Sequence, residues 1–222
     1  MAATPLLELR NLACERDERF LFAGLNAHFY AGQVVQILGP NGSGKTSLLR
    51  ILAGVSQDFY GDISWQGQAI ANARWEYASD MVYLGHLPGI KKSLTPLENL
   101  RWYAAGQDGV GDAELVHALA QVQLAGYEDT PSYRLSAGQL RRVALARLVF
   151  SRAKLWILDE PFTALDKSGV AQLEARLAAH ASSGGLILVT SHQDINVPNL
   201  QLLDLQDFPA SAQANYEDAA YG

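Results

Sequence analysis

The 222-residue chain contains a single cysteine, Cys14. With one thiol it can form neither a disulfide framework within the chain nor a cysteine-based metal site. No stretch approaches the roughly 20 consecutive apolar residues that a membrane-spanning helix requires. The first residues lack a basic segment followed by an apolar one, so we expect no secretory signal and a cytoplasmic location.

Basic residues are also scarce. Lysine and arginine number 17 against 23 acidic residues, which gives a formal net charge of -6. This balance argues against a general affinity for nucleic acid or for anionic lipid. Any phosphate chemistry must therefore be local. The hydrophobic fraction of 49% is ample for a substantial core in a chain of this length.

Residues 39–46 fit the phosphate-binding pattern G-x-x-x-x-G-K-[ST] at every fixed position. An apolar run at 33–38 predicts a strand before this loop, and residues 47–53 have helical periodicity after it. Glycines let successive backbone N–H groups point into one concavity, and the helix adds its positive dipole end. We expect Lys45 to reach the β- and γ-phosphates of a bound triphosphate and Thr46 to be a Mg²⁺ ligand. The predicted nucleotide-binding residues are Gly39, Pro40, Asn41, Gly42, Ser43, Gly44, Lys45 and Thr46.

A second apolar run, at 155–158, ends in the acidic pair Asp159 and Glu160. In parallel sheets, ligands gather at the carboxyl ends of the strands, so both acids should arrive at the phosphate loop. Asp159 is expected to hold Mg²⁺. Glu160 is expected to polarise the attacking water as a general base, which distinguishes hydrolysis from mere binding.

Strand and helix patterns alternate in most of the chain, which favours a mainly parallel sheet. An edge strand is expected at Leu6–Leu12, with an antiparallel neighbour at Leu25–Tyr30 and a small hairpin within residues 61–70. From His86 to about Tyr133 no strong strand signal appears, and the capping box of Thr95 and Glu98 predicts the start of a helix within this stretch. We therefore predict one domain over residues 5–205 that carries a helical lobe at 86–151, followed by a flexible tail at 206–222.

Residues 135–139 (LSAGQ) precede a helical stretch that Ser136 is placed to cap. This pentapeptide resembles the signature motif of ATP-binding cassette (ABC) ATPases, and the order of the other motifs agrees. The resemblance implies a P-loop NTPase (RecA-like) α/β core with an antiparallel β subdomain and an inserted helical lobe. It also implies that Ser136, Gly138 and Gln139 form a second anion site at a helix N-terminus. In this family that site meets the ATP of the opposite subunit in a head-to-tail dimer.

The same resemblance assigns further residues. Asp166 matches the family's D-loop and is expected at the dimer contact. His192 matches the histidine that senses the γ-phosphate, and it completes a catalytic set with Lys45 and Glu160. Two positions depart from the family pattern: His86 stands where a glutamine is usual, and no aromatic residue occupies the adenine-stacking position near Arg16. Either the Arg16 guanidinium or Phe20 could stack on the base.

A narrower resemblance lies in residues 83–91, 94–100 and 156–164, which look like the ATP-binding subunit of the cytochrome c maturation (Ccm) haem exporters. The His86 departure is shared with that group. The resemblance implies a peripheral subunit on the cytoplasmic face of a bacterial inner membrane, using ATP to drive release of haem-loaded chaperone. It further implies a homodimer that docks on an integral membrane subunit through residues 86–94, with associated haem-handling membrane proteins as further partners.

Three other functional hypotheses can be compared with this one. An ABC ATPase for another cargo would share every catalytic residue. A nucleotide-gated binding module without productive hydrolysis is disfavoured by Glu160 and His192. A GTPase switch is disfavoured because the sequence has no N-K-x-D motif for reading guanine.

Overall fold

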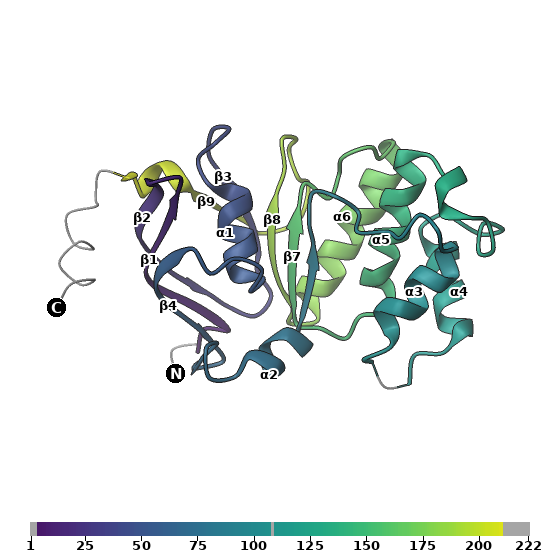
Figure 1. Cartoon of the computed structure of the whole chain (residues 1–222), viewed down its shortest axis with the longest axis horizontal. Coiled ribbons are helices and arrows are strands. Elements are labelled where there is room, and N and C mark those ends of the chain that lie inside the picture. Colours follow the sequence, from purple (N-terminus) through teal and green to yellow (C-terminus); the bar gives the residue numbers. More distant parts are fainter. Residues whose placement is uncertain (1–3, 108, 211–222) are drawn as a thin grey trace. The chain divides into compact units, whose positions relative to one another are not determined.

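The computed structural model describes residues 4–107 and 109–210, and these form two compact units (Figure 1). The first unit holds residues 4–83, 153–159 and 177–210. The second holds Leu84–Arg152 and Glu160–Arg176. The predicted lobe at 86–151 thus lies within the second unit, together with a segment that follows Asp159. Of the predicted tail, residues 211–222 lie outside the described part.

A five-stranded sheet carries the core of the first unit. Its strand order is β6-β7-β8-β3-β9, and the pairs β7–β8, β8–β3 and β3–β9 are parallel. The strands are β3 (Val34–Leu38), β6 (Met81–Leu84), β7 (Leu155–Asp159), β8 (Leu186–Thr190) and β9 (Leu200–Asp204). Every residue of β7 and of β8 is buried, as the continuous apolar runs predict for central parallel strands. The predicted α/β class is confirmed, although the sequence did not identify β9.

A four-stranded antiparallel sheet has the order β2-β1-β4-β5. Its strands are β1 (Leu7–Arg16), β2 (Arg19–Phe29), β4 (Phe59–Trp65) and β5 (Gln68–Ala69). The prediction of an edge strand at Leu6–Leu12 is wrong, because β1 pairs with β2 on one side and with β4 on the other. The pairing of β1 with β4 could not be predicted from local patterns, because β4 lies in a distant part of the chain. The predicted hairpins β1–β2 and β4–β5 are confirmed.

Helix α1 (Lys45–Leu52) buries one face that contains Leu48, Leu49, Ile51 and Leu52. These side chains join residues of both sheets in one hydrophobic cluster, so the core fixes the helix that follows the phosphate loop. A short helix α2 (Arg74–Ser79), which was not predicted, precedes β6, and a 3₁₀ turn (Leu205–Asp207) follows β9.

The second unit is helical. It contains α3 (Pro96–Ala104), α4 (Asp112–Gln121), a 3₁₀ turn (Ser132–Arg134) and α5 (Ala137–Phe150). Leu100, Leu119 and Val143 contribute to a common core of these three helices. The predicted capping box of Thr95 and Glu98 is present. Helix α6 (Lys167–Ser182) begins in this unit and continues into the first. None of the helices within residues 4–107 and 109–210 has the length and apolarity needed to cross a bilayer.

Candidate nucleotide site

The phosphate loop connects the end of β3 at Leu38 with the start of α1 at Lys45. Gly44 is the N-cap of α1 and has a φ of +98°, a left-handed conformation that favours glycine. A Cβ at Gly44 would lie 3.0 Å from the Leu21 Cβ and 3.0 Å from the Phe22 Cδ1, both in β2. Glycine is therefore required here by backbone conformation and by the close approach of the neighbouring strand.

Two side chains of the loop turn toward its own backbone. Lys45 Nζ donates hydrogen bonds to the carbonyl oxygens of Gly39 at 2.6 Å and Pro40 at 3.1 Å. Ser43 Oγ is buried and has no hydrogen-bond partner among the described residues. A Cβ added at Gly39 would lie only 2.4 Å from Ser43 Oγ, so the hydroxyl is packed closely against the Gly39 backbone. A buried hydroxyl and an ammonium on one concave loop suit an anion with several acceptor oxygens.

The carboxylate of Asp159 lies beside the start of α1. Its Oδ1 accepts hydrogen bonds from Thr46 Oγ1 at 3.3 Å and from Thr190 Oγ1 at 2.8 Å. Asp159 is buried, with 2% of its surface exposed. Hard oxygen donors of this kind suit Mg²⁺, which is usually bound through one or two carboxylates plus phosphate oxygens and waters. Within the described residues no group of three or more His, Cys, Asp or Glu side chains could hold a metal by itself.

Strand register explains why these groups meet. Asp159 pairs with Thr190 across β7 and β8, and Thr190 pairs with Ile37 across β8 and β3. The carboxyl ends of three neighbouring strands therefore stand level, and the loop that follows β3 begins at that edge. The sequence prediction that Asp159 reaches the phosphate loop agrees with this register.

His192 follows β8 by two residues and is exposed. The turn before it is fixed by Ser191, whose Oγ donates to the Gln193 carbonyl at 2.9 Å and accepts from the Gln193 N–H at 3.0 Å. The buried Gln36 of β3 donates from Nε2 to the Ser191 carbonyl at 3.3 Å. His192 is thus held on the same edge of the sheet as Asp159.

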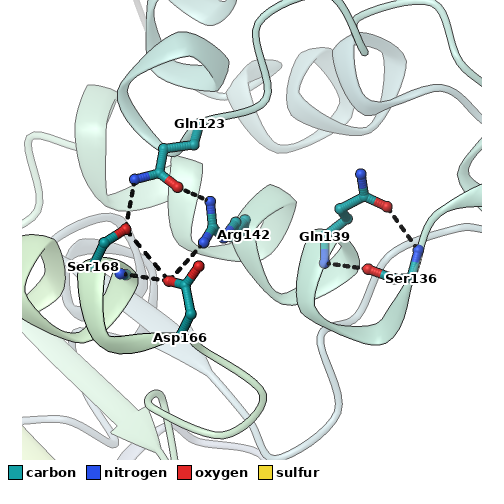
Figure 2. A network of polar contacts seen from close by, with 7 residues as sticks. Gln123, Ser136, Gln139, Arg142, Asp166 and Ser168 are labelled. Atoms are coloured by element: carbon teal, nitrogen blue, oxygen red, sulfur yellow. Dashed lines mark hydrogen bonds and ion pairs between the residues drawn. The ribbon is translucent and has the colours of Figure 1, made fainter.

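In the second unit, Ser136 caps α5 through a reciprocal capping box (Figure 2). Ser136 Oγ accepts from the Gln139 N–H at 3.2 Å, and the Ser136 N–H donates to Gln139 Oε1 at 2.9 Å. The predicted cap is confirmed. Gly138 lies in the first turn, and a Cβ there would be 2.8 Å from the Ala164 carbonyl oxygen. A glycine is needed at this position because the loop after β7 runs against the helix.

Asp166 is held within its own chain (Figure 2). Its Oδ1 accepts from the Gly169 N–H at 2.8 Å and pairs with Arg142 Nη2 at 2.9 Å. The hydrogen bond from the Gly169 N–H is the largest single cause that lowers the pKa of this carboxyl below its ordinary value, and the charge and hydrogen bond of Arg142 lower it further. Arg142 also donates to Gln123, which in turn donates to Ser168 at 2.9 Å. Asp166 therefore acts as a helix cap and ties α5 to the start of α6.

Glu160 directly follows Asp159 but belongs to the second unit. Its φ is +50°, which is rare for a residue with a side chain. Its carbonyl oxygen accepts a hydrogen bond of 2.5 Å from Arg141 Nη2. His86, also in the second unit, is exposed, and its carbonyl lies 3.5 Å from Arg141 Nη1.

Arg16 is the last residue of β1 and is exposed, and its Nε lies 3.6 Å from the Asp17 carboxylate. It lines a cavity of 190 Å³ together with Cys14 of its own strand and Ser47 of α1, the residue after Thr46. Phe20 instead stacks on Tyr60, with ring centroids 5.8 Å apart. Of the two candidates for stacking on the base, Arg16 alone lines this cavity.

Sequence reasoning missed Thr190, Gln36 and Arg141. A Thr at the end of a buried strand is a weak signal, because Thr is common in strands for packing reasons alone. Nothing in the sequence around Arg141 indicates that its side chain is buried, since three of the four residues in Gln-Leu-Arg-Arg are polar or charged. Its role depends on tertiary contacts with residues far along the chain.

Comparison with known proteins identifies the family of this chain. Residues 22–163 match the family model described as ABC transporter. The chain belongs to the ABC transporter family. It is 51% identical over 209 residues to the cytochrome c biogenesis ATP-binding export protein CcmA of Saccharophagus degradans, covering 90% of this chain and 93% of that protein. It is 53% identical over 192 residues to the protein of the same name from Escherichia coli K12, covering 86% and 91%.

Among solved structures, this ABC protein resembles the dimeric post-hydrolysis structure of the ATP-binding cassette MJ0796 bound to ADP and Pi. The TM-score is 0.76 at 21% identity, with 90% of this chain and 94% of that chain covered. At this identity the likeness concerns the fold alone. It agrees with the predicted P-loop core that carries a helical lobe.

Proposed function

We propose that this chain is the ATP-hydrolysing subunit of an exporter in cytochrome c biogenesis and that it powers the release of haem-loaded chaperone. The observation that carries the proposal is identity of 51–53% along nearly the whole chain to two ATP-binding export proteins of that system. The geometry of the first unit supports ATP as the nucleotide, because a phosphate loop and a buried carboxylate meet at one edge of the sheet.

We assign the chemistry as follows. Lys45 and the loop N–H groups bind the phosphates, while Thr46 and Asp159 hold Mg²⁺, which neutralises charge on the phosphate oxygens when bound. Glu160 accepts a proton from the attacking water, and His192 contacts the γ-phosphate. Ser136, Gly138 and Gln139 bind the γ-phosphate of a nucleotide held by a second copy of the chain. Arg16 stacks on the adenine through its guanidinium plane.

A site divided in this way requires a homodimer. We further propose that each copy docks on an integral membrane subunit through residues 86–94, on the cytoplasmic face of a bacterial inner membrane. Asn99 gives this segment a defined shape: its side chain accepts from the Lys91 N–H at 2.8 Å and donates to the Lys91 and Thr95 carbonyls at 3.1 and 2.9 Å. Asn99 is 1% exposed, so the docking segment is supported from within.

Complementation tests the proposal. The chain is expressed in Escherichia coli lacking its own CcmA, and covalently haem-bound c-type cytochromes are measured. We expect restored cytochromes with the natural chain and none with Glu160→Gln, a variant expected to bind ATP and accumulate a nucleotide-bound dimer. The chain serves another cargo if the purified protein hydrolyses ATP in a Glu160-dependent way, the complemented cells contain no c-type cytochromes, and a pull-down identifies a different membrane partner.

A further inference from the structure

Arg141 lies in α5, five residues after Ser136, and only 3% of its surface is exposed. A buried guanidinium is costly unless its N–H groups find acceptors. Here the acceptors are backbone carbonyls from two separate segments of the same unit. Nη2 donates to Glu160 at 2.5 Å and Nε to Pro161 at 3.2 Å, while Nη1 donates to Gly85 at 3.0 Å.

The segment that Arg141 contacts is strained at two points. Glu160 has a φ of +50° and Ala164 a φ of +62°. Residues with side chains persist in this region only where surrounding contacts over-determine the backbone. Helix α5 contacts the carbonyls of both residues: Arg141 donates to Glu160, and the missing side chain of Gly138 admits the Ala164 carbonyl. The next helix residue, Arg142, pairs with Asp166 at the end of the segment.

We propose that Arg141 is a positioning residue for Glu160, and that it fixes the left-handed backbone that aims this carboxylate. The inference rests on the proposed role of Glu160 as general base. Because Ser136 and Arg141 stand on the same short helix, the orientation of the general base is tied to the helix whose N-terminus meets the partner's nucleotide. Segment Glu160–Asp166 then moves together with α5, so that closing of the dimer and orientation of the Glu160 carboxylate occur together.

A steady-state experiment with four single variants and one double variant tests this. Arg141→Met keeps an apolar chain of similar length and removes all guanidinium donors. Arg141→Lys keeps the charge and loses the planar fork. Arg147→Met is the matched control, because Arg147 is a guanidinium of the same helix that stacks 3.8 Å over Tyr103, a partly buried ring that packs against the core of the helical lobe. Glu160→Gln reports on the proposed function itself.

We expect Arg141→Met to lower kcat by about 10- to 100-fold, since small displacements of a catalytic group have effects of that size. KM for ATP and the affinity for a fluorescent ATP analogue should change by less than about threefold, because uniform binding is untouched. Arg141→Lys should fall between the natural chain and Arg141→Met. Arg147→Met should keep kcat within about twofold. In the Glu160→Gln background, adding Arg141→Met should lower the residual rate no further.

Three results would overturn the inference: an unchanged kcat in Arg141→Met, a loss confined to KM, or the same fold-loss with and without Glu160→Gln. If Arg141→Met does not fold, Arg141→Lys decides, and its having the natural kcat would refute the inference. If instead Glu160→Gln hydrolyses ATP at the natural rate, the proposed role of Glu160 fails, which is a separate outcome.

Discussion

Thr190, the last residue of β8, donates its hydroxyl to Asp159 Oδ1, the last residue of β7, over 2.8 Å. The two residues are register partners in adjacent parallel strands. The same oxygen also accepts from Thr46 on α1. One carboxylate oxygen is thus fixed from two elements, which holds the other oxygen in a defined direction.

This relationship predicts the effect of Thr190→Val. Valine preserves the shape and the β-branched packing, but the donor to Asp159 is lost. Hydrogen bonds to charged groups contribute about 1.5–3 kcal/mol, so the Mg²⁺ concentration giving half-maximal ATP hydrolysis should rise by roughly tenfold or more. A Mg²⁺ titration of the ATPase rate measures this. Thr190→Ser keeps the donor and is the control; equal Mg²⁺ requirements in all three proteins would contradict the prediction.

The contacts of Lys45 predict a loss of nucleotide binding in Lys45→Ala. Its ammonium is the one cationic side chain that the loop sequence offers to a triphosphate. We expect binding of a fluorescent ATP analogue to weaken by at least about 100-fold, and hydrolysis to be abolished. The melting temperature without nucleotide should change little, since Lys45 bonds only to carbonyls of an exposed loop in the described contacts. Near-normal hydrolysis would reject the phosphate-loop assignment.

Ser136→Arg tests the second half-site. The bulky cation would occupy the N-terminus of α5, where we propose that a partner's γ-phosphate binds. We expect a monomer to bind ATP normally while hydrolysis and nucleotide-dependent dimerisation, measured by size-exclusion chromatography with light scattering, are lost. Ser136→Thr retains a capping hydroxyl and should retain activity. Dimerisation that survives Ser136→Arg would argue that the two half-sites do not join.

Most of the fold could be predicted from sequence because its signals are local. The buried runs of β7 and β8, the capping boxes at Thr95 and Ser136, and the loop at 39–46 each specify structure within a few residues. Strand β9 and the inner position of β1 could not be predicted. Both depend on pairing between segments far apart in the chain, and β9 has exposed residues and no buried apolar run.

The same distinction applies to the site. Local sequence motifs were sufficient to predict the roles of Lys45, Thr46 and Asp159. No motif near Arg141 in the sequence indicates a role for its side chain. Its hydrogen bonds go to carbonyls that lie 19 and 56 positions away along the chain. Asp166 was predicted at a dimer contact from the family resemblance. The structure adds a role as the cap of α6, which the spacing Asp166 to Gly169 could have indicated.

The cavity beside Arg16 predicts how the base is bound. If the guanidinium stacks on adenine, Arg16→Ala should weaken ATP binding by roughly three- to 30-fold, whereas Arg16→Tyr should restore or improve it because an aromatic ring offers the same planar surface. Titration with ATP and with inorganic triphosphate separates base from phosphate contributions. Triphosphate binding should be unaffected in both variants. Equal loss for both ligands would show that Arg16 acts through charge instead of stacking.

The pairing of Trp156 and His180 predicts a pH dependence of stability. The two rings stack with centroids 3.7 Å apart and an interplanar angle of 5°, and His180 Nε2 lies 3.2 Å from the Lys154 carbonyl. Burial lowers the pKa of His180, an effect that the Lys154 carbonyl opposes. The folded-state pKa is therefore below the ordinary value of about 6.5. Above that pH both folded and unfolded chains carry a neutral ring, and this group contributes no pH dependence.

As the pH falls through about 6.5, the unfolded chain takes up a proton at this histidine while the folded chain does not, so the free energy of unfolding decreases toward the folded-state pKa. His180→Phe keeps a stacked ring that cannot titrate. We expect its melting temperature to fall less than that of the natural chain between about pH 7.5 and 5.5, when the two proteins are compared in the same buffers. Because every other titrating group is shared, the difference between the two curves isolates His180. Parallel curves would mean that this imidazole is protonated equally easily in the folded and unfolded chains.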